Sequence, residues 1–151
     1  MIVHWPAGIA DRGALRHTPG HFIDLMPTLI ELSGSKVGGD FGGATPPPLP
    51  GHSLVPALAK DVTIERDFLY WHHMNHRAIR VGDWKLVSAG TKGGVGPWEL
   101  YNVREDRSEL KNLAAEQPEK VAELSKLWQQ HEAEFIKQAG PVEPVKAPRA
   151  K

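Results

Sequence analysis

The sequence contains no cysteine among its 151 residues. Disulfides, thiolate metal sites and a cysteine nucleophile are therefore excluded within this chain. It also lacks net charge, because 18 lysines and arginines balance 18 aspartates and glutamates. Without an excess of positive charge, no overall field attracts nucleic acid or an anionic membrane. We expect no nucleic-acid partner.

Long apolar runs are missing as well. No stretch approaches the ~20 apolar residues that cross a bilayer, so we expect no membrane span. The N-terminal residues MIVHWPAG lack the basic and then apolar layout of a signal peptide. The chain is therefore expected to be cytosolic or to have its export signal outside these residues.

Residues 21–33, HFIDLMPTLIELS, place apolar side chains at helical spacing. Asp24 is the predicted N-cap, Pro27 falls in the first turn, where proline is tolerated, and Gly34 supplies the C-terminal stop. A short helical turn is predicted within 51–60. The first 60 residues are thus expected to contain one longer and one shorter helix.

Three further segments lie outside the predicted helices. Residues 2–5, IVHW, form a β-prone run that needs neighbouring strands to be stable. Residues 36–51 are rich in glycine and proline and predict a loop. After Gly140, proline and lysine dominate, which predicts a disordered tail.

An antiparallel sheet is predicted between Arg66 and Tyr101, where apolar and polar residues alternate around glycine-containing breaks. Gly82 and Asp83 form the expected hairpin turn, and residues 88–97 are expected to be a glycine-rich loop. The predicted strands lie near 67–73, 77–81, 84–88 and 98–101.

A helix is predicted over 118–137, because its apolar residues recur at intervals of three and four. That face is expected to pack on the sheet. It is made of Val121, Leu124, Leu127, Trp128, His131 and Phe135.

Three histidines, His72, His73 and His76, fall within the predicted sheet. Neighbouring strand residues point to opposite faces, so His72 and His73 cannot both bind one ion without a bulge, and we predict no complete metal site. Two interpretations remain open. The histidines cap a loop or fill the sheet surface, or one of them, His73 first, faces a cleft and contacts an anionic substrate. Arg77 and Arg80 are expected to be solvated strand residues.

Together, these segments resemble the C-terminal part of the formylglycine-dependent, arylsulfatase-like sulfatases of the alkaline phosphatase superfamily. They stand in the family's order over about residues 2–135. The matching segments read IVHWPAGI, HFIDLMPTLIELSG, GHSLVPAL, RDFLYWHHMNHRAIRVGDWKLV and WELYNVREDRSELKNLA, followed by an amphipathic helix.

The resemblance implies an α+β fold. Residues 1–60 would be the end of an alkaline-phosphatase-like α/β catalytic domain and contribute one strand and a helix. Residues 61–138 would be a small antiparallel sheet covered by a C-terminal helix, and residues 139–151 a disordered tail.

The resemblance also implies the hydrolysis of sulfate esters. The formylglycine nucleophile arises from the Cys or Ser of a C/S-x-P-x-R motif that this sequence lacks. The calcium carboxylates would lie in a missing N-terminal sulfatase portion, so no catalytic or metal-binding residue is assigned here. Calcium and formylglycine are expected in the full-length parent, and this chain alone is expected to be inactive.

Within the match, Trp71–Arg80 corresponds to the family pattern WEHxGNRAxR. His73 matches the family histidine near the substrate pocket, whereas His72, Asn75 and His76 replace the usual Glu, Gly and Asn. His73 and His76 are therefore the expected contacts to a sulfated small molecule or glycan at the pocket rim.

Family members are commonly periplasmic, secreted or lysosomal. The alternatives are a non-catalytic, carbohydrate-binding or truncated module, and a phosphoesterase of the same superfamily.

Overall fold

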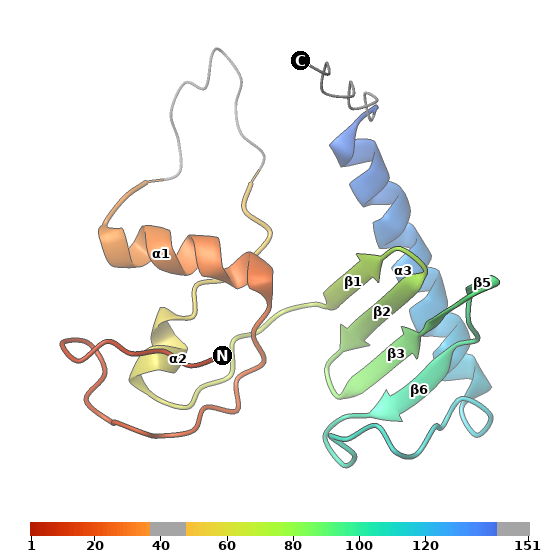
Figure 1. Ribbon diagram of the computed structural model, residues 1–151, viewed down its shortest axis with the longest axis horizontal. Helices are drawn as coiled ribbons and strands as arrows, with labels where there is room; N and C mark the ends of the chain where they lie inside the picture. Colours follow the sequence, from red (N-terminus) through yellow and green to blue (C-terminus); the bar gives the residue numbers. More distant parts are fainter. Residues whose placement is uncertain (37–47, 142–151) are drawn as a thin grey trace, which may run out of the picture. The chain divides into compact units, whose positions relative to one another are not determined.

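The computed structural model describes residues 1–36 and 48–141 (Figure 1). The chain divides into two compact units, Met1–Arg66 and Asp67–Lys151, and each is described by itself. The loop predicted at 36–51 and the tail predicted at 139–151 fall largely outside the described residues.

Two α-helices form the regular part of the first unit. A 3₁₀ turn, Phe22–Asp24, leads directly into α1, Leu25–Ser33. The helix ends at Gly34, whose φ of 65° suits glycine and whose N–H bonds back to the last turn. The second helix, α2, spans Val55–Ala59. Both predicted helices are confirmed, as is the glycine stop.

The start of α1 differs from the prediction. Asp24 occupies the N-cap position, but its side chain makes no capping bond to α1. The chain enters a 3₁₀ turn first, and His21 and Asp24 form a reciprocal capping box around that turn. The carboxylate of Asp24 is thereby turned toward other segments of the unit.

The strand predicted at residues 2–5 is not formed in this chain. The Trp5 carbonyl instead accepts turn hydrogen bonds from Gly8 and Ile9, and Ile2 is 98% exposed. A strand needs a neighbour for its backbone groups, and no described residue provides one for this segment.

The second unit contains a four-stranded antiparallel sheet in the order β1-β2-β3-β6 (Figure 1). All four predicted strands are confirmed within two residues. Gly82, with φ of 57°, lies in the two-residue turn between β2 and β3. The strands are β1 Leu69–His73, β2 His76–Val81, β3 Trp84–Ser88 and β6 Glu99–Asn102.

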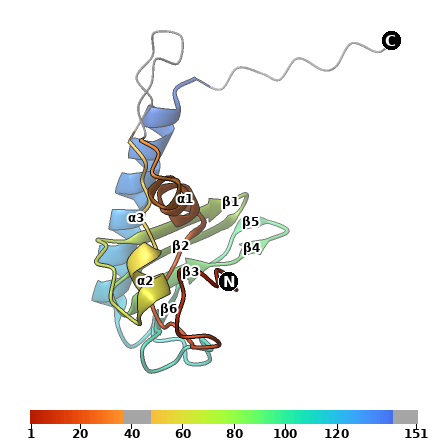
Figure 2. The same cartoon turned by 90° about the vertical axis from the view of Figure 1, so that its left-hand side faces the viewer.

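Residues 88–97, predicted as a glycine-rich loop, join β3 to β6 as expected, but they contain two short strands that were not predicted. The segment forms a small hairpin of β4, Gly90–Thr91, and β5, Gly94–Val95. Its glycines provide no apolar alternation, which is the signal that predicts strands. The hairpin extends from the end of the sheet at which β1 turns into β2 (Figures 1 and 2).

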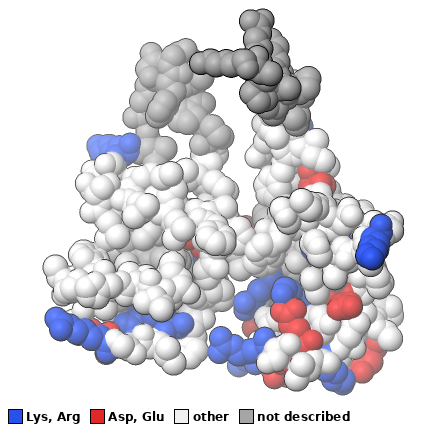
Figure 3. Space-filling view, in the orientation of Figure 1, with Lys and Arg blue, Asp and Glu red and all other residues white. Residues whose placement is uncertain are grey.

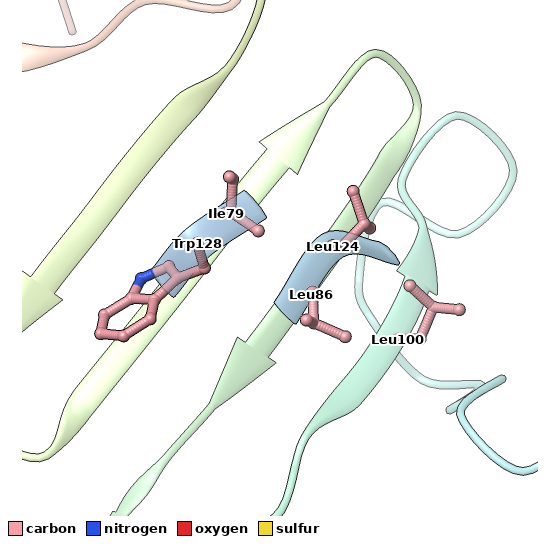
Figure 4. Close-up of a cluster of buried hydrophobic side chains, with 5 residues drawn as sticks. All are labelled: Ile79, Leu86, Leu100, Leu124 and Trp128. Carbon is pink, nitrogen blue, oxygen red and sulfur yellow. The ribbon is translucent and has the colours of Figure 1, made fainter. Parts of the chain in front are cut away.

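Helix α3, Pro118–Ala139, covers one face of the four-stranded sheet. Leu124 and Trp128 project from the helix onto one residue from each of three strands, namely Ile79, Leu86 and Leu100 (Figure 4). The predicted helix and its packing on the sheet are confirmed, and so is the α+β fold class.

None of the helices in the described ranges has the length and apolar character needed to cross a bilayer.

Candidate functional site

Strand register separates the three histidines onto two faces of the sheet. Tyr70 pairs with Ile79, and His72 pairs with Arg77, so these side chains share the face that α3 covers. His73 pairs with His76, one position further along, and both therefore lie on the opposite face. The prediction that His72 and His73 point to opposite faces is confirmed.

His72 is held against α3. Its Nδ1 lies 3.1 Å from a carboxylate oxygen of Glu132, and its Nε2 lies 2.9 Å from the Met74 carbonyl oxygen. The Tyr70 hydroxyl donates to the same glutamate. Burial and then this hydrogen bond raise the pKa of Tyr70. His72 thus belongs to the contact between sheet and helix, and its ring is not available to a ligand.

His73 and His76 occupy directly opposed positions at the end of the β1–β2 hairpin. Both are exposed. The two residues that join them are Met74 and Asn75, and Met74 has a φ of 53°, an uncommon value for a residue with a side chain. The tight turn brings the two imidazoles onto one surface at the tip of the hairpin.

The ring of His76 is held by a backbone group. The Gly90 N–H donates to Nδ1 of His76 at 3.0 Å. Gly90 begins β4, so the β4–β5 hairpin contacts the β1–β2 turn. A Cβ at Gly90 would lie only 2.9 Å from Cβ of Asn75. Sequence reasoning missed this contact because the partners are 14 residues apart and the glycine-rich segment carries no chemical motif.

The prediction that Arg77 is a solvated strand residue was wrong. Arg77 is half-buried, and its guanidinium carbon lies 4.1 Å from the centre of the Trp98 ring and 5.5 Å from that of Trp128. Trp98 directly precedes β6, and Trp128 projects from α3. The cation therefore stacks on aromatic surface between the sheet and the helix. Arg80 is also partly buried, and its Nε donates to the Gly82 carbonyl.

The histidine pair does not by itself make a metal centre. Across residues 1–36 and 48–141, no three His, Asp or Glu side chains gather as a set that could hold a metal ion. The histidine pair and its described surroundings therefore do not fit calcium, which favours six to eight oxygen ligands. His73 and His76 are two exposed imidazoles, side chains that can donate or accept hydrogen bonds.

Charge on the molecular surface is mixed. In the face shown in Figure 3, the acidic and basic side chains of the second unit are interspersed. Recognition at the histidine pair would therefore depend on individual donors rather than on a broad field.

The family follows from comparison with known proteins. A family model described as N-sulphoglucosamine sulphohydrolase, C-terminal, matches residues 1–137. The chain belongs to this family, whose members include hydrolases of sulfate esters. The resemblance to the C-terminal part of sulfatases is confirmed.

Individual relatives agree with the family. An uncharacterized sulfatase of Schizosaccharomyces pombe is 32% identical over 130 residues, which cover 74% of this chain and 21% of that protein. Arylsulfatase K of Danio rerio is 30% identical over 121 residues, which cover 72% of this chain and 21% of that protein. The chain spans about a fifth of the length of these curated relatives.

A solved structure has a similar fold. The structure of BT4656 in complex with its substrate, D-glucosamine-2-N,6-O-disulfate, matches with a TM-score of 0.53 and 26% identity. The match covers 78% of this chain and 24% of that chain.

Proposed function

We propose that this chain is the C-terminal portion of a sulfatase and that its histidine pair forms part of the rim of the substrate pocket. His73 is the first proposed contact to a sulfated sugar, and His76 is the second. The observation that carries the proposal is the direct pairing of two exposed histidines on the sheet face away from α3. Family membership supports the reaction class, and the substrate named for the similar structure supports a sulfated sugar.

The chemistry of the pair suits a sulfate group. Sulfate oxygens only accept hydrogen bonds, and an imidazole N–H donates them, more strongly when the ring carries a positive charge. Within the described part of the chain, no residue hydrogen-bonds to the ring of His73, so both of its nitrogens are free for a ligand. His76 has one nitrogen occupied by Gly90 and one available.

The chemical step itself is placed outside this chain. We propose that formylglycine and calcium are supplied by the rest of the sulfatase, and no bond-breaking role is assigned to a residue here. The chain alone should therefore bind a sulfated sugar weakly and should not hydrolyse sulfate esters.

Binding can be tested by NMR on the isotope-labelled 151-residue chain. Titration with D-glucosamine-2-N,6-O-disulfate should shift the amide signals of residues 72–77, and glucosamine without sulfate should not. His73→Ala should weaken binding by at least ~10-fold, the effect expected for losing a hydrogen bond to a charged group. His4→Ala is the matched control, because His4 is an exposed histidine in the other unit.

Two results would contradict the proposal. Equal shifts with and without sulfate would show that the pair does not recognise the sulfate group. Unchanged affinity in both His73→Ala and His76→Ala would remove the histidines from the site. Separately, turnover of an aryl sulfate by this chain in excess calcium would overturn the expectation that it is inactive alone.

A further inference from the structure

We propose that Gly90 is a positioning residue that fixes the tautomer of His76 and keeps its second nitrogen open. His76 would then act as a hydrogen-bond donor through Nε2 and not as a general base. The tautomer follows from the structure of the second unit alone. The identity of the ligand, an acceptor such as a sulfate oxygen, rests on the function proposed above.

The tautomer follows from the hydrogen bond to Gly90. A backbone N–H can only donate, so Nδ1 of His76, 3.0 Å away, must accept with its lone pair. The proton of the neutral ring therefore resides on Nε2. A general base would need an unprotonated nitrogen facing its substrate, and the only unprotonated nitrogen here faces the Gly90 N–H.

Glycine at this position also leaves space beside Nε2. A Cβ added at Gly90 would lie 3.1 Å from Nε2 of His76 and 2.9 Å from Cβ of Asn75. A side chain would thus crowd the donor nitrogen and push against the β1–β2 turn. The same residue supplies the N–H that orients the ring and leaves the His76 ring and the β1–β2 turn uncrowded.

The rest of the β4–β5 hairpin holds Gly90 in place. The Gly96 N–H donates to the Ala89 carbonyl at 3.0 Å, and the Ser88 hydroxyl donates to the Gly96 carbonyl at 2.7 Å. Ser88 is fully buried at the end of β3. These hydrogen bonds anchor the β4–β5 hairpin to the end of β3 and so fix the position of the Gly90 N–H. That N–H in turn orients the His76 ring.

The hydrogen bond can be observed directly in the unsubstituted chain. A scalar coupling between the amide nitrogen of Gly90 and Nδ1 of His76 arises only across an N–H···N hydrogen bond. We expect this coupling and, in the neutral form of the His76 ring, a proton on Nε2. Absence of the coupling, or a neutral ring protonated at Nδ1, would overturn the proposal without requiring any variant to fold.

A pair of glycine substitutions tests the positioning role. Gly90→Ala should abolish the coupling and weaken binding of D-glucosamine-2-N,6-O-disulfate by about 10-fold, the loss expected for one hydrogen bond to a charged group. Gly93→Ala in the same hairpin is the control, because its Cβ would meet only Thr91 Oγ1 at 3.8 Å. It should preserve both the coupling and the affinity.

The outcomes separate this inference from the proposed function. A coupling present in a chain that binds no sulfated sugar would leave the tautomer established and remove the proposed ligand. Sulfate-dependent binding without the coupling would keep the rim site and refute the role of Gly90. Equal affinity of Gly90→Ala and the unsubstituted chain would likewise refute that role.

Discussion

The Arg66 guanidinium donates to both carboxylate oxygens of Asp24, at 3.3 Å and 3.1 Å. The same carboxylate accepts from the N–H of His21 at 2.7 Å and from that of His52 at 2.9 Å. Asp24 is fully buried. One charged group therefore joins the start of the helical segment, the segment before α2 and the end of the first unit.

Asp24→Asn should strongly destabilise the first unit. The substitution leaves the Arg66 side chain, which is 11% exposed, without its counter-charge, and breaking a buried pair costs about 3–5 kcal/mol. Hydrogen exchange measured by mass spectrometry should show faster exchange in peptides covering 21–34 and 51–60. Glu31→Gln, which removes an exposed carboxylate from the same helix, should leave exchange unchanged. Equal exchange in the two variants would contradict a structural role for the ion pair.

The same carboxylate predicts acid sensitivity of the first unit. Burial raises the pKa of Asp24, but the N–H of His52, the Arg66 guanidinium and the N–H of His21 together hold the pKa below its usual value. Because the folded pKa is the lower one, the stabilisation is complete above the unfolded pKa of ~3.9 and is lost as pH falls through the folded value.

Thermal or urea unfolding of the first unit, followed by hydrogen exchange, should therefore show a loss of stability below about pH 4. The Asp24→Asn variant should be less stable than the unsubstituted chain at neutral pH, and it should lose less of its stability when the pH is lowered. A parallel pH dependence in both proteins would assign the acid sensitivity to other carboxylates.

Leu124→Ala should destabilise the second unit by about 2–5 kcal/mol, because it opens a cavity in a packed core. Leu124 is 1% exposed and packs against Ile79, Leu86 and Leu100. Urea denaturation followed by tryptophan fluorescence measures the change. Leu110→Ala removes a leucine that is 86% exposed and should change the free energy of unfolding by less than about 0.5 kcal/mol. Similar losses in both variants would mean that this cluster is not the core.

Much of the second unit could be predicted because its signals are local. The turn residues Gly82 and Asp83 predicted the β2–β3 hairpin, and the spacing of apolar residues predicted α3. The opposite orientations of His72 and His73 followed from strand alternation alone.

What could not be predicted depends on contacts between distant residues. The partners of Asp24 lie 28 and 42 residues away, at His52 and Arg66, and no local pattern joins them. The stacking of Arg77 on Trp98 requires the sheet and α3 to be assembled first. The β4–β5 hairpin was not predicted because its segment is rich in glycine, which has no side chain and so gives no alternation of apolar and polar residues.

Arg77→Lys should destabilise the second unit by about 0.5–2 kcal/mol. The flat guanidinium lies over the Trp98 ring at 4.1 Å, and lysine retains the charge but loses the stacking surface. Urea denaturation provides the measurement, and Arg107→Lys, at an exposed position, is the matched control. A loss no larger than that of the control would show that the aromatic contact contributes nothing to stability.

The two tyrosines of the chain should resist ionisation at alkaline pH. A hydrogen bond to Glu99, with burial second, raises the pKa of Tyr101 to about 12. Burial, and then the hydrogen bond to Glu132, raises the pKa of Tyr70. Ultraviolet absorbance should therefore show little tyrosinate near pH ~10, the usual value.

Glu99→Gln should shift one of the two titrations back toward pH ~10, because a neutral amide no longer opposes the negative phenolate. Glu105→Gln is the control, since it removes an exposed carboxylate from the turn after β6 and should leave both titrations in place. The pKa of each tyrosine is higher in the folded chain than in the unfolded chain. The stability contributed by the protonated tyrosines is therefore complete below the unfolded pKa of ~10 and is lost as pH rises through the folded pKa. Two tyrosines titrating together near pH ~10 in a folded chain would show that neither carboxylate contact persists in solution.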